Sequence, residues 1–199
     1  MNLREYRVLF ITVTGILILL VASPALSRLL VYPRTEFFTE MWILGPKHKA
    51  EDYPFNVSRG QNYSVVLGIE NHLGYCAYYV VEVKFRNQTQ SAPTSFNRAP
   101  SSLPPLYNIT AFVADKETWE YPLTFSLDYM YNKTLMQVEF YSLKLNDVVL
   151  NLTGYTTAWN AEKNGFFGNL FFEAWICNTT INNFQFHERF VGLWLNMTA

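Results

Sequence analysis

The residues of this chain that most clearly carry chemistry are asparagines in the pattern Asn-X-Ser/Thr, whose side-chain amide accepts an N-linked glycan in exported proteins. All of these sequons lie on the C-terminal side of an apolar segment near the N-terminus, and their acceptors are Asn56, Asn62, Asn87, Asn108, Asn132, Asn151, Asn178 and Asn196. We expect a glycosylated, exported protein, with Asn62 the weaker acceptor because it stands where a predicted strand begins. The alternative is that a β-protein rich in Ser, Thr and Asn accumulates such triplets without modification.

Two cysteines, Cys76 and Cys177, also lie on this side of the apolar segment, each at one end of a predicted strand. Disulfides persist outside the cell, and a bridge here would join distant parts of the fold. Sequence does not establish that the two residues are close in space. A disulfide and two free buried thiols are therefore both compatible with the sequence.

Residues for catalysis or metal binding do not form a recognisable set. The three histidines, His48, His72 and His187, include no pair at metal-ligand spacing. Glu70 and His72 share a strand face, where we expect a hydrogen-bonded turn histidine, and we expect His187 to Arg189 on a solvent-facing strand. The chain has no Gly-rich phosphate loop, no Gly-x-Ser-x-Gly and no Cys-x-x-Cys. We expect no enzymatic activity, no cofactor and no metal.

Aromatic residues make up 17% of the chain, and the net charge is −1. A chain with this charge lacks the basic footprint of nucleic-acid binding, so we expect no nucleic-acid partner. Trp119, Tyr121, Trp159 and Trp194 can stack on sugars if they are exposed. At this aromatic content we expect them in the core.

A membrane anchor is predicted at residues 1–31. No charged residue occurs between Arg7 and Arg28, and about 20 apolar residues in a helix cross a hydrocarbon core. Arg4 and Arg7 precede the apolar run, which favours a cytoplasmic N-terminus and an extracellular segment 32–199. A cleaved signal peptide is the alternative, since small residues at 22–27 suit a peptidase, but the apolar run is longer than a usual signal core.

The stretch from Asn62 to Phe85 predicts a β-hairpin, two strands around a short turn at residues 71–74. Its apolar residues alternate with polar ones, which is typical of half-buried strands. The expected core face carries Val65, Leu67, Ile69, Tyr79, Val81, Val83 and Phe85, and the opposite face carries Glu82, Lys84 and Arg86.

The remaining segments predict more short strands. They cover residues 32–44, 106–113, 121–129, 135–145, 148–152, 170–176 and 184–195. Residues 154–168 contain glycines and are expected to be irregular. The four prolines of residues 91–105 predict a loop, which is either a disordered surface loop or a loop that contacts a partner. Eight or nine strands with turns between them predict an all-β fold, an antiparallel immunoglobulin-like β-sandwich behind one N-terminal transmembrane helix.

Several short motifs resemble the DUF1616 family. They are Trp42-Ile-Leu-Gly-Pro46, Asp52-Tyr-Pro-Phe-Asn-Val-Ser-Arg-Gly60, Leu67-Gly-Ile-Glu-Asn-His72, Glu117-Thr-Trp-Glu-Tyr-Pro122, Gln137-Val-Glu-Phe-Tyr141 and the closing segment His187 to Thr198. The resemblance covers most of residues 32–198 and implies the C-terminal exported domain of membrane proteins found mainly in archaea. Members commonly carry several transmembrane helices before this domain, whereas one is predicted here. The family is uncharacterised, so the resemblance implies location and fold but no activity.

These observations predict a singly anchored, glycosylated cell-surface protein that acts as a non-enzymatic interaction module. Its partners would be the membrane, an envelope or membrane protein, or a glycan. The alternative is an accessory subunit of a membrane-embedded complex, such as one that handles lipid-linked sugars. A hydrolase or carbohydrate-binding module using surface aromatics is a third hypothesis, which a concave pocket with convergent carboxylates would favour.

Overall fold

The computed structural model describes residues 3–29, 37–94 and 96–198, and it divides the chain into two compact units, residues 1–36 and 37–199. The first unit contains the helix α1 (Leu3–Leu29). Its window Tyr6–Ser23 has a mean hydropathy of 2.1, and none of that window is buried. By length and composition this helix is able to cross a membrane. The predicted N-terminal apolar helix is therefore confirmed, while residues 30–31 of the predicted anchor lie outside the described residues.

The second unit is mostly β. Its described residues form the strands β1 (Phe38–Leu44), β2 (Asn56–Ser58), β3 (Tyr63–His72), β4 (Ala77–Asn87), β5 (Tyr107–Val113), β6 (Thr118–Asn132), β7 (Gln137–Leu145), β8 (Val148–Asn151), β9 (Thr156–Asn160), β10 (Gly165–Asn178) and β11 (Asn183–Thr198).

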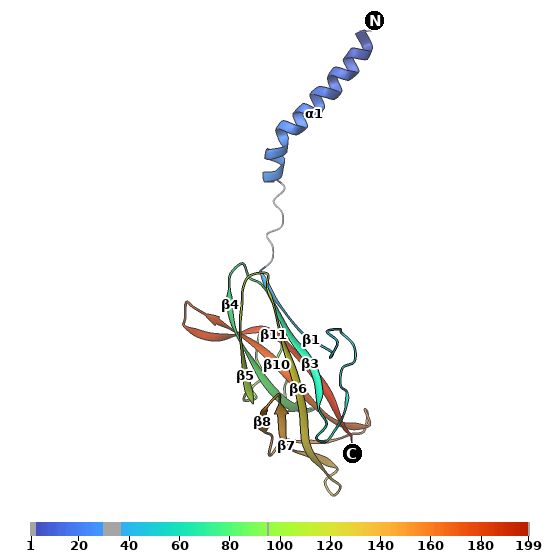
Figure 1. Cartoon of the computed structure of the whole chain (residues 1–199), viewed down its shortest axis with the longest axis vertical. Helices are drawn as coiled ribbons and strands as arrows, with labels where there is room; N and C mark the ends of the chain where they lie inside the picture. Colours follow the sequence, from blue (N-terminus) through green and yellow to red (C-terminus); the bar gives the residue numbers. More distant parts are fainter. Residues whose placement is uncertain (1–2, 30–36, 95, 199) are drawn as a thin grey trace. The chain divides into compact units, whose positions relative to one another are not determined.

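These strands form one large, curled sheet (Figure 1). The main path runs β1-β3-β6-β7-β9-β10-β11-β2, with β4 beside β10, β5 beside β4, and β8 beside β7. The short strand β9 pairs with both β7 and β10 and so links the two halves. All pairs are antiparallel except β2 with β11, which is parallel, so the predicted antiparallel arrangement holds for every other pair among the described strands.

One hydrophobic core receives side chains from both halves of the sheet. The alternate residues predicted to face inward on β3 and β4 are all buried. Phe85 of β4 meets Phe140 of β7 edge to face, with ring centroids 4.9 Å apart. Burying an apolar side chain of this kind contributes about 1.5–3 kcal/mol, so the period-two pattern accounts for much of the folding free energy.

The predicted hairpin is wrong in its pairing, although both of its strands form. β3 pairs with β1 and β6, whereas β4 pairs with β5 and β10. Near the end of β3, the fully buried Asn71 fixes the connection to β4. Its Nδ2 donates to the carbonyl oxygens of Tyr75 and Val113, and its Oδ1 accepts from the Leu73 amide. The chain therefore crosses from one half of the sheet to the other.

Residues 154–168 are also more regular than predicted, since they contain β9 and the start of β10. Glycine serves close packing there: a Cβ on Gly168 would lie 2.4 Å from the ring of Phe85. Glycine in a strand commonly marks such a close approach. The expected total of eight or nine strands was too low for this reason and because β2 is only three residues long.

Candidate binding groove

The eight sequon asparagines divide into two groups by what their amide nitrogens do. Asn56, Asn62, Asn108 and Asn151 are exposed, and Asn87, Asn132, Asn178 and Asn196 are half-buried. In the half-buried group every Nδ2 donates a hydrogen bond, to Thr156 O, Glu139 Oε1, Gln185 Oε1 and Asn56 Oδ1 respectively. A glycan replaces an Nδ2 hydrogen. The exposed group is therefore the better set of acceptors, and it includes Asn62, the acceptor that the sequence had marked as weaker.

The two cysteines are not bonded to each other in the structure. Cys76 is exposed and Cys177 half-buried, and both line one pocket of about 330 Å³ together with Tyr78 and Phe112. The disulfide itself stays a prediction.

Two of the three histidines pair with single carboxylates. His72 Nε2 lies 2.9 Å from Glu70 Oε1, as their shared strand face predicts, and His48 Nδ1 lies 3.0 Å from Glu120 Oε2. Within the described part of the chain, no three His, Cys, Asp or Glu side chains gather in a way that suits a metal ion.

His187 differs from its predicted place on a solvent face. It is half-buried, and its Nε2 lies 2.7 Å from Oγ1 of the buried Thr39. That hydroxyl lies 2.9 Å from the phenol of Tyr79. Burial, and secondly the charge of Arg189, lowers the pKa of His187 to about 4. The residue is thus a neutral hydrogen-bonding group between β1 and β11.

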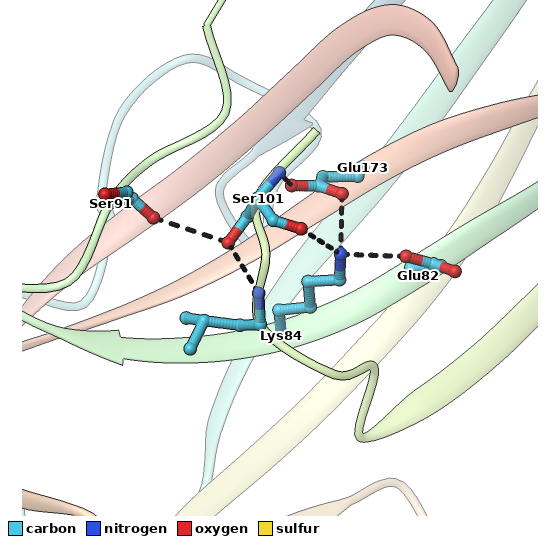
Figure 2. A network of polar contacts seen from close by, with 6 residues as sticks. Glu82, Lys84, Ser91, Ser101 and Glu173 are labelled. Carbon is cyan, nitrogen blue, oxygen red and sulfur yellow. Dashed lines mark hydrogen bonds and ion pairs between the residues drawn. The ribbon is translucent and has the colours of Figure 1, made fainter. Parts of the chain in front are cut away.

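A buried ion pair is the polar site that the sequence did not reveal (Figure 2). Lys84 Nζ on β4 lies 2.8 Å from Glu173 Oε2 on β10 and 2.9 Å from Glu82 Oε2. Lys84 is 2% exposed and Glu173 is 0% exposed. Glu173 lies inside the predicted apolar strand 170–176. A single carboxylate among buried apolar residues needs a cationic partner, and this was the signal in the sequence for a buried ion pair.

The segment 91–105 covers this ion pair. Ser101 is buried, its amide donates to Glu173 Oε1 at 2.7 Å, and its carbonyl accepts from Lys84 Nζ at 3.2 Å. Every charged atom of the pair thus has a partner. The network ties Ser101 of the Pro-rich segment to the sheet, and its Lys84 and Glu173 side chains are enclosed by the protein.

An open site with exposed aromatic side chains is a pair of adjoining pockets that we name the Trp194 groove. The smaller pocket, about 490 Å³, lies between residues 41–43 of β1, 53–55, and 191–194 of β11. The larger pocket, about 850 Å³, is lined by Phe55, Gln88, Thr89, Asn160, Glu162, Lys163, Phe167 and Trp194. Phe55 and Trp194 line both pockets. Their volumes are in the range of small-molecule sites.

Hydrogen bonds and close packing hold the segments of the groove in place. The Tyr53 hydroxyl donates to Ile43 O at 2.8 Å, and the Asn196 amide donates to Phe55 O at 2.7 Å. A Cβ on Gly68 would lie 2.2 Å from the ring of Trp42, so this glycine makes room for the indole. The three segments that meet here carry three of the motifs behind the family resemblance.

Two cations flank the indole of Trp194. The Arg86 guanidinium carbon lies 4.7 Å and Lys163 Nζ 5.9 Å from its ring centroid. Arg86 is fixed by hydrogen bonds to Asn169 Oδ1 and Gln90 O, both 2.9 Å long. Burial lowers the pKa of Arg86, which stays protonated as arginine does in proteins. Cation–π contacts of this kind hold an exposed indole in one orientation.

The four aromatics singled out from the sequence have different environments. Trp119 and Tyr121 stack with ring centroids 5.6 Å apart and pack against the core, as expected. Trp159 and Trp194 are each 39% exposed. Trp159 rests edge-on against Phe166, so of the four only Trp194 lines the groove.

Comparison with known proteins gives a family but no activity. A family model described as a domain of unknown function (DUF1616) matches residues 33–146. No curated protein matches the chain.

Solved structures resemble the chain only distantly. A β-glucosidase from Listeria innocua in complex with isofagomine aligns with 83% of this chain at 9% identity and a TM-score of 0.38, and this chain spans 17% of that protein. The ASH/PapD-like domain 7 of human CEP192 aligns over 85% of this chain and 92% of its own, at 9% identity and a TM-score of 0.31. At these TM-scores neither structure informs the function.

Proposed function

We propose that this chain, which belongs to the DUF1616 family, is a non-enzymatic interaction module on the cell surface. A single N-terminal helix would anchor the module in the membrane. The observation that carries this proposal is the Trp194 groove, where three distant segments build an exposed aromatic surface. Contiguous exposed apolar surface on a monomer commonly marks a binding site.

The location proposed for this module is extracellular, with the N-terminus in the cytoplasm. The apolar window Tyr6–Ser23, preceded by Arg4, supports it. The sequons support it as well, because N-linked glycans are added to exported domains. We propose that Asn56, Asn62, Asn108 and Asn151 carry the glycans, since these residues are exposed and their amide nitrogens make no hydrogen bond within the described chain.

We also propose that the curled sheet is an immunoglobulin-like sandwich. One layer would be β1-β3-β6-β7-β8 and the other β5-β4-β10-β11-β2, with the shared core between them. The edge-to-face contact of Phe85 with Phe140 and the crossing held by Asn71 support two facing layers. In this arrangement the Trp194 groove includes the edge of β1 and the outer face of β10 and β11.

Mild-detergent extraction of the full-length protein from its native membrane, followed by identification of co-purifying proteins, tests the function. We expect a partner that the double variant Phe55→Ala/Trp194→Ala loses and the exposed control Phe112→Ala keeps. A stoichiometric multi-helix partner would make the chain an accessory subunit of a membrane complex. Retention of every partner by the groove variant would contradict the proposal.

Intact mass and site-by-site glycopeptide mapping of the same sample test the location. We expect an uncleaved N-terminus and sugar at the four exposed sequons. A chain without sugar would remove the glycoprotein part of the proposal. A chain that begins after Ser23 would remove the anchor.

A further inference from the structure

We propose that the larger pocket of the Trp194 groove binds a saccharide that carries a carboxylate. This inference rests on the proposed function and names the class of ligand that the same groove would take. It follows from the strands under the pocket, from its side chains and from its charge.

The backbone beneath the pocket has no free edge for a partner strand. Phe167 of β10 pairs with Asn196 of β11, and the next residue, Gly168, pairs with Asn87 of β4. Addition of a peptide strand needs an unpaired edge. Recognition in this pocket therefore depends on side chains, which suits a compact ligand rather than an extended peptide.

The side chains of the pocket match the two kinds of surface on a sugar ring. The exposed Phe55 and Trp194 offer aromatic faces to the C–H groups of a sugar ring, and the buried Phe167 supports Phe55 from below. The hydroxyls of the ring need donors and acceptors in fixed positions. Gln88 and Asn160 supply amides, and Glu162 supplies a carboxylate.

The two amides are already oriented by the protein. Asn160 Nδ2 donates to Gln88 Oε1, Gln88 Nε2 donates to Ala158 O, and the Lys163 amide donates to Asn160 Oδ1. Each NH₂ group has two hydrogens, so each keeps one for a ligand. Because these two side chains are ordered before a ligand binds, association costs less conformational entropy.

Lys163 and Glu162 balance each other in the pocket lining, and the excess positive charge lies beside Trp194, where it favours an acidic group on the sugar. Arg86 and Lys163 flank Trp194, and Glu162 is the acidic residue of the pocket lining. Arg86 is already committed to Asn169 and Gln90. The exposed Lys163 ammonium makes no ion pair within the described residues, so it is the group available to a ligand carboxylate.

Isothermal titration of the full-length protein in detergent tests the inference, with oligogalacturonate as the acidic probe and maltohexaose as the neutral one. We expect oligogalacturonate to bind at least tenfold more tightly than maltohexaose and to weaken as salt rises. Trp194→Ala should lower affinity tenfold or more. Lys163→Gln should lower it several-fold and reduce the preference for the acidic sugar, and Lys163→Arg should restore it. The exposed controls Phe112→Ala and Lys133→Gln should bind as the unmodified protein does.

Three results would overturn the inference. They are the absence of binding by either probe, equal binding of the two probes, and unchanged affinity in both Trp194→Ala and Lys163→Gln. If the groove variants still lose a protein partner in the extraction experiment, the proposed function stands and only the ligand class is wrong. If they keep every partner and the saccharide binds, the interaction proposal fails separately.

Discussion

The outer face of β4, β10 and β11 has two regions, one that another segment of the chain covers and one that opens into a groove. Side chains alternate along a strand, so Phe167 and Glu173 of β10 point to the same face. At Glu173 the segment 91–105 covers the face, and the charges of Glu173 and Lys84 are buried and paired. Near Phe167, against which Phe55 packs, the face opens into the groove, and Lys163 and Trp194 stay accessible.

The comparison shows that a charged side chain serves stability where other residues of the chain pack over it, and stays available for binding where they do not. Beneath the segment, an unpaired charge would cost several kcal/mol, so every charged atom has a partner and the loss of one partner is destabilising. In the open region, water solvates Lys163 and no internal partner is needed. Stability should therefore depend on the covered region and binding on the open one.

The largest effect should come from Lys84→Met. This change leaves Glu173 buried with a charge and only the Ser101 amide as its donor, and breaking a buried pair in this way costs about 3–5 kcal/mol. Chemical denaturation of the full-length protein in detergent measures the loss. The exposed Lys144→Met is the matched control, for which we expect a change within about 0.5 kcal/mol.

The double variant Lys84→Met/Glu173→Leu sharpens this test, because it removes both charges. Replacing a buried ion pair by apolar residues is often neutral, so much of the loss should be recovered. A double variant as unstable as Lys84→Met would show that packing, and not the unpaired charge, causes the loss.

The next effect is a pH dependence at the contact between β1 and β11. The pKa of His187 is about 4 in the folded chain against 6.5 ordinarily, so the unfolded chain binds a proton more readily. Stability is therefore complete above pH 6.5 and falls as the pH drops from 6.5 to 4, by up to about 3 kcal/mol.

Unfolding free energies of the unmodified protein and of His187→Gln, measured across this pH range, test the dependence. The variant should lose the part of the slope that His187 contributes. The exposed His48→Gln should keep the whole slope. Equal slopes in all three proteins would mean that His187 is protonated in the folded chain at an ordinary pH.

The sequence predicted the faces of strands better than their neighbours. Every residue that alternation in residues 62–85 placed on the core face of β3 and β4 is buried, because burial on that face follows the local period, although Val66, Asn71 and Lys84 are buried as well. It did not reveal that β4 pairs with β10, since any strand with an apolar face can pair with several others. Alternation likewise placed Lys84 opposite the core but did not reveal that this residue is covered, because its cover comes from the distant Ser101.

The candidate site was predictable only in pieces. Trp194 and the motifs at 42–46 and 52–60 were all visible in the sequence. Their convergence depends on the parallel pairing of β2 with β11, which brings Phe55 beside Trp194. No local pattern encodes a contact between residues so far apart in the chain.

A smaller change in stability is expected for Trp194→Ala in the open region. The indole is 39% exposed, and its contact with Arg86 contributes about 0.5–1 kcal/mol at such a site. We expect a loss of about 1 kcal/mol, measured by the same denaturation, together with loss of the partner in the extraction experiment. A loss as large as that of Lys84→Met would contradict the division between stability and binding.

The smallest expected change in stability is that of Lys163→Gln. The Lys163 ammonium makes one distant contact with Trp194 and no ion pair within the described chain, and substitutions of exposed residues usually alter stability by less than about 0.5 kcal/mol. Oligogalacturonate affinity should nevertheless fall several-fold in this variant. Unchanged stability together with reduced affinity in this variant would be the most direct support for the comparison. Lys84 and Lys163 carry the same charged group and differ in whether other residues cover it. Equal losses of stability in Lys84→Met and Lys163→Gln would mean that cover does not separate the two regions.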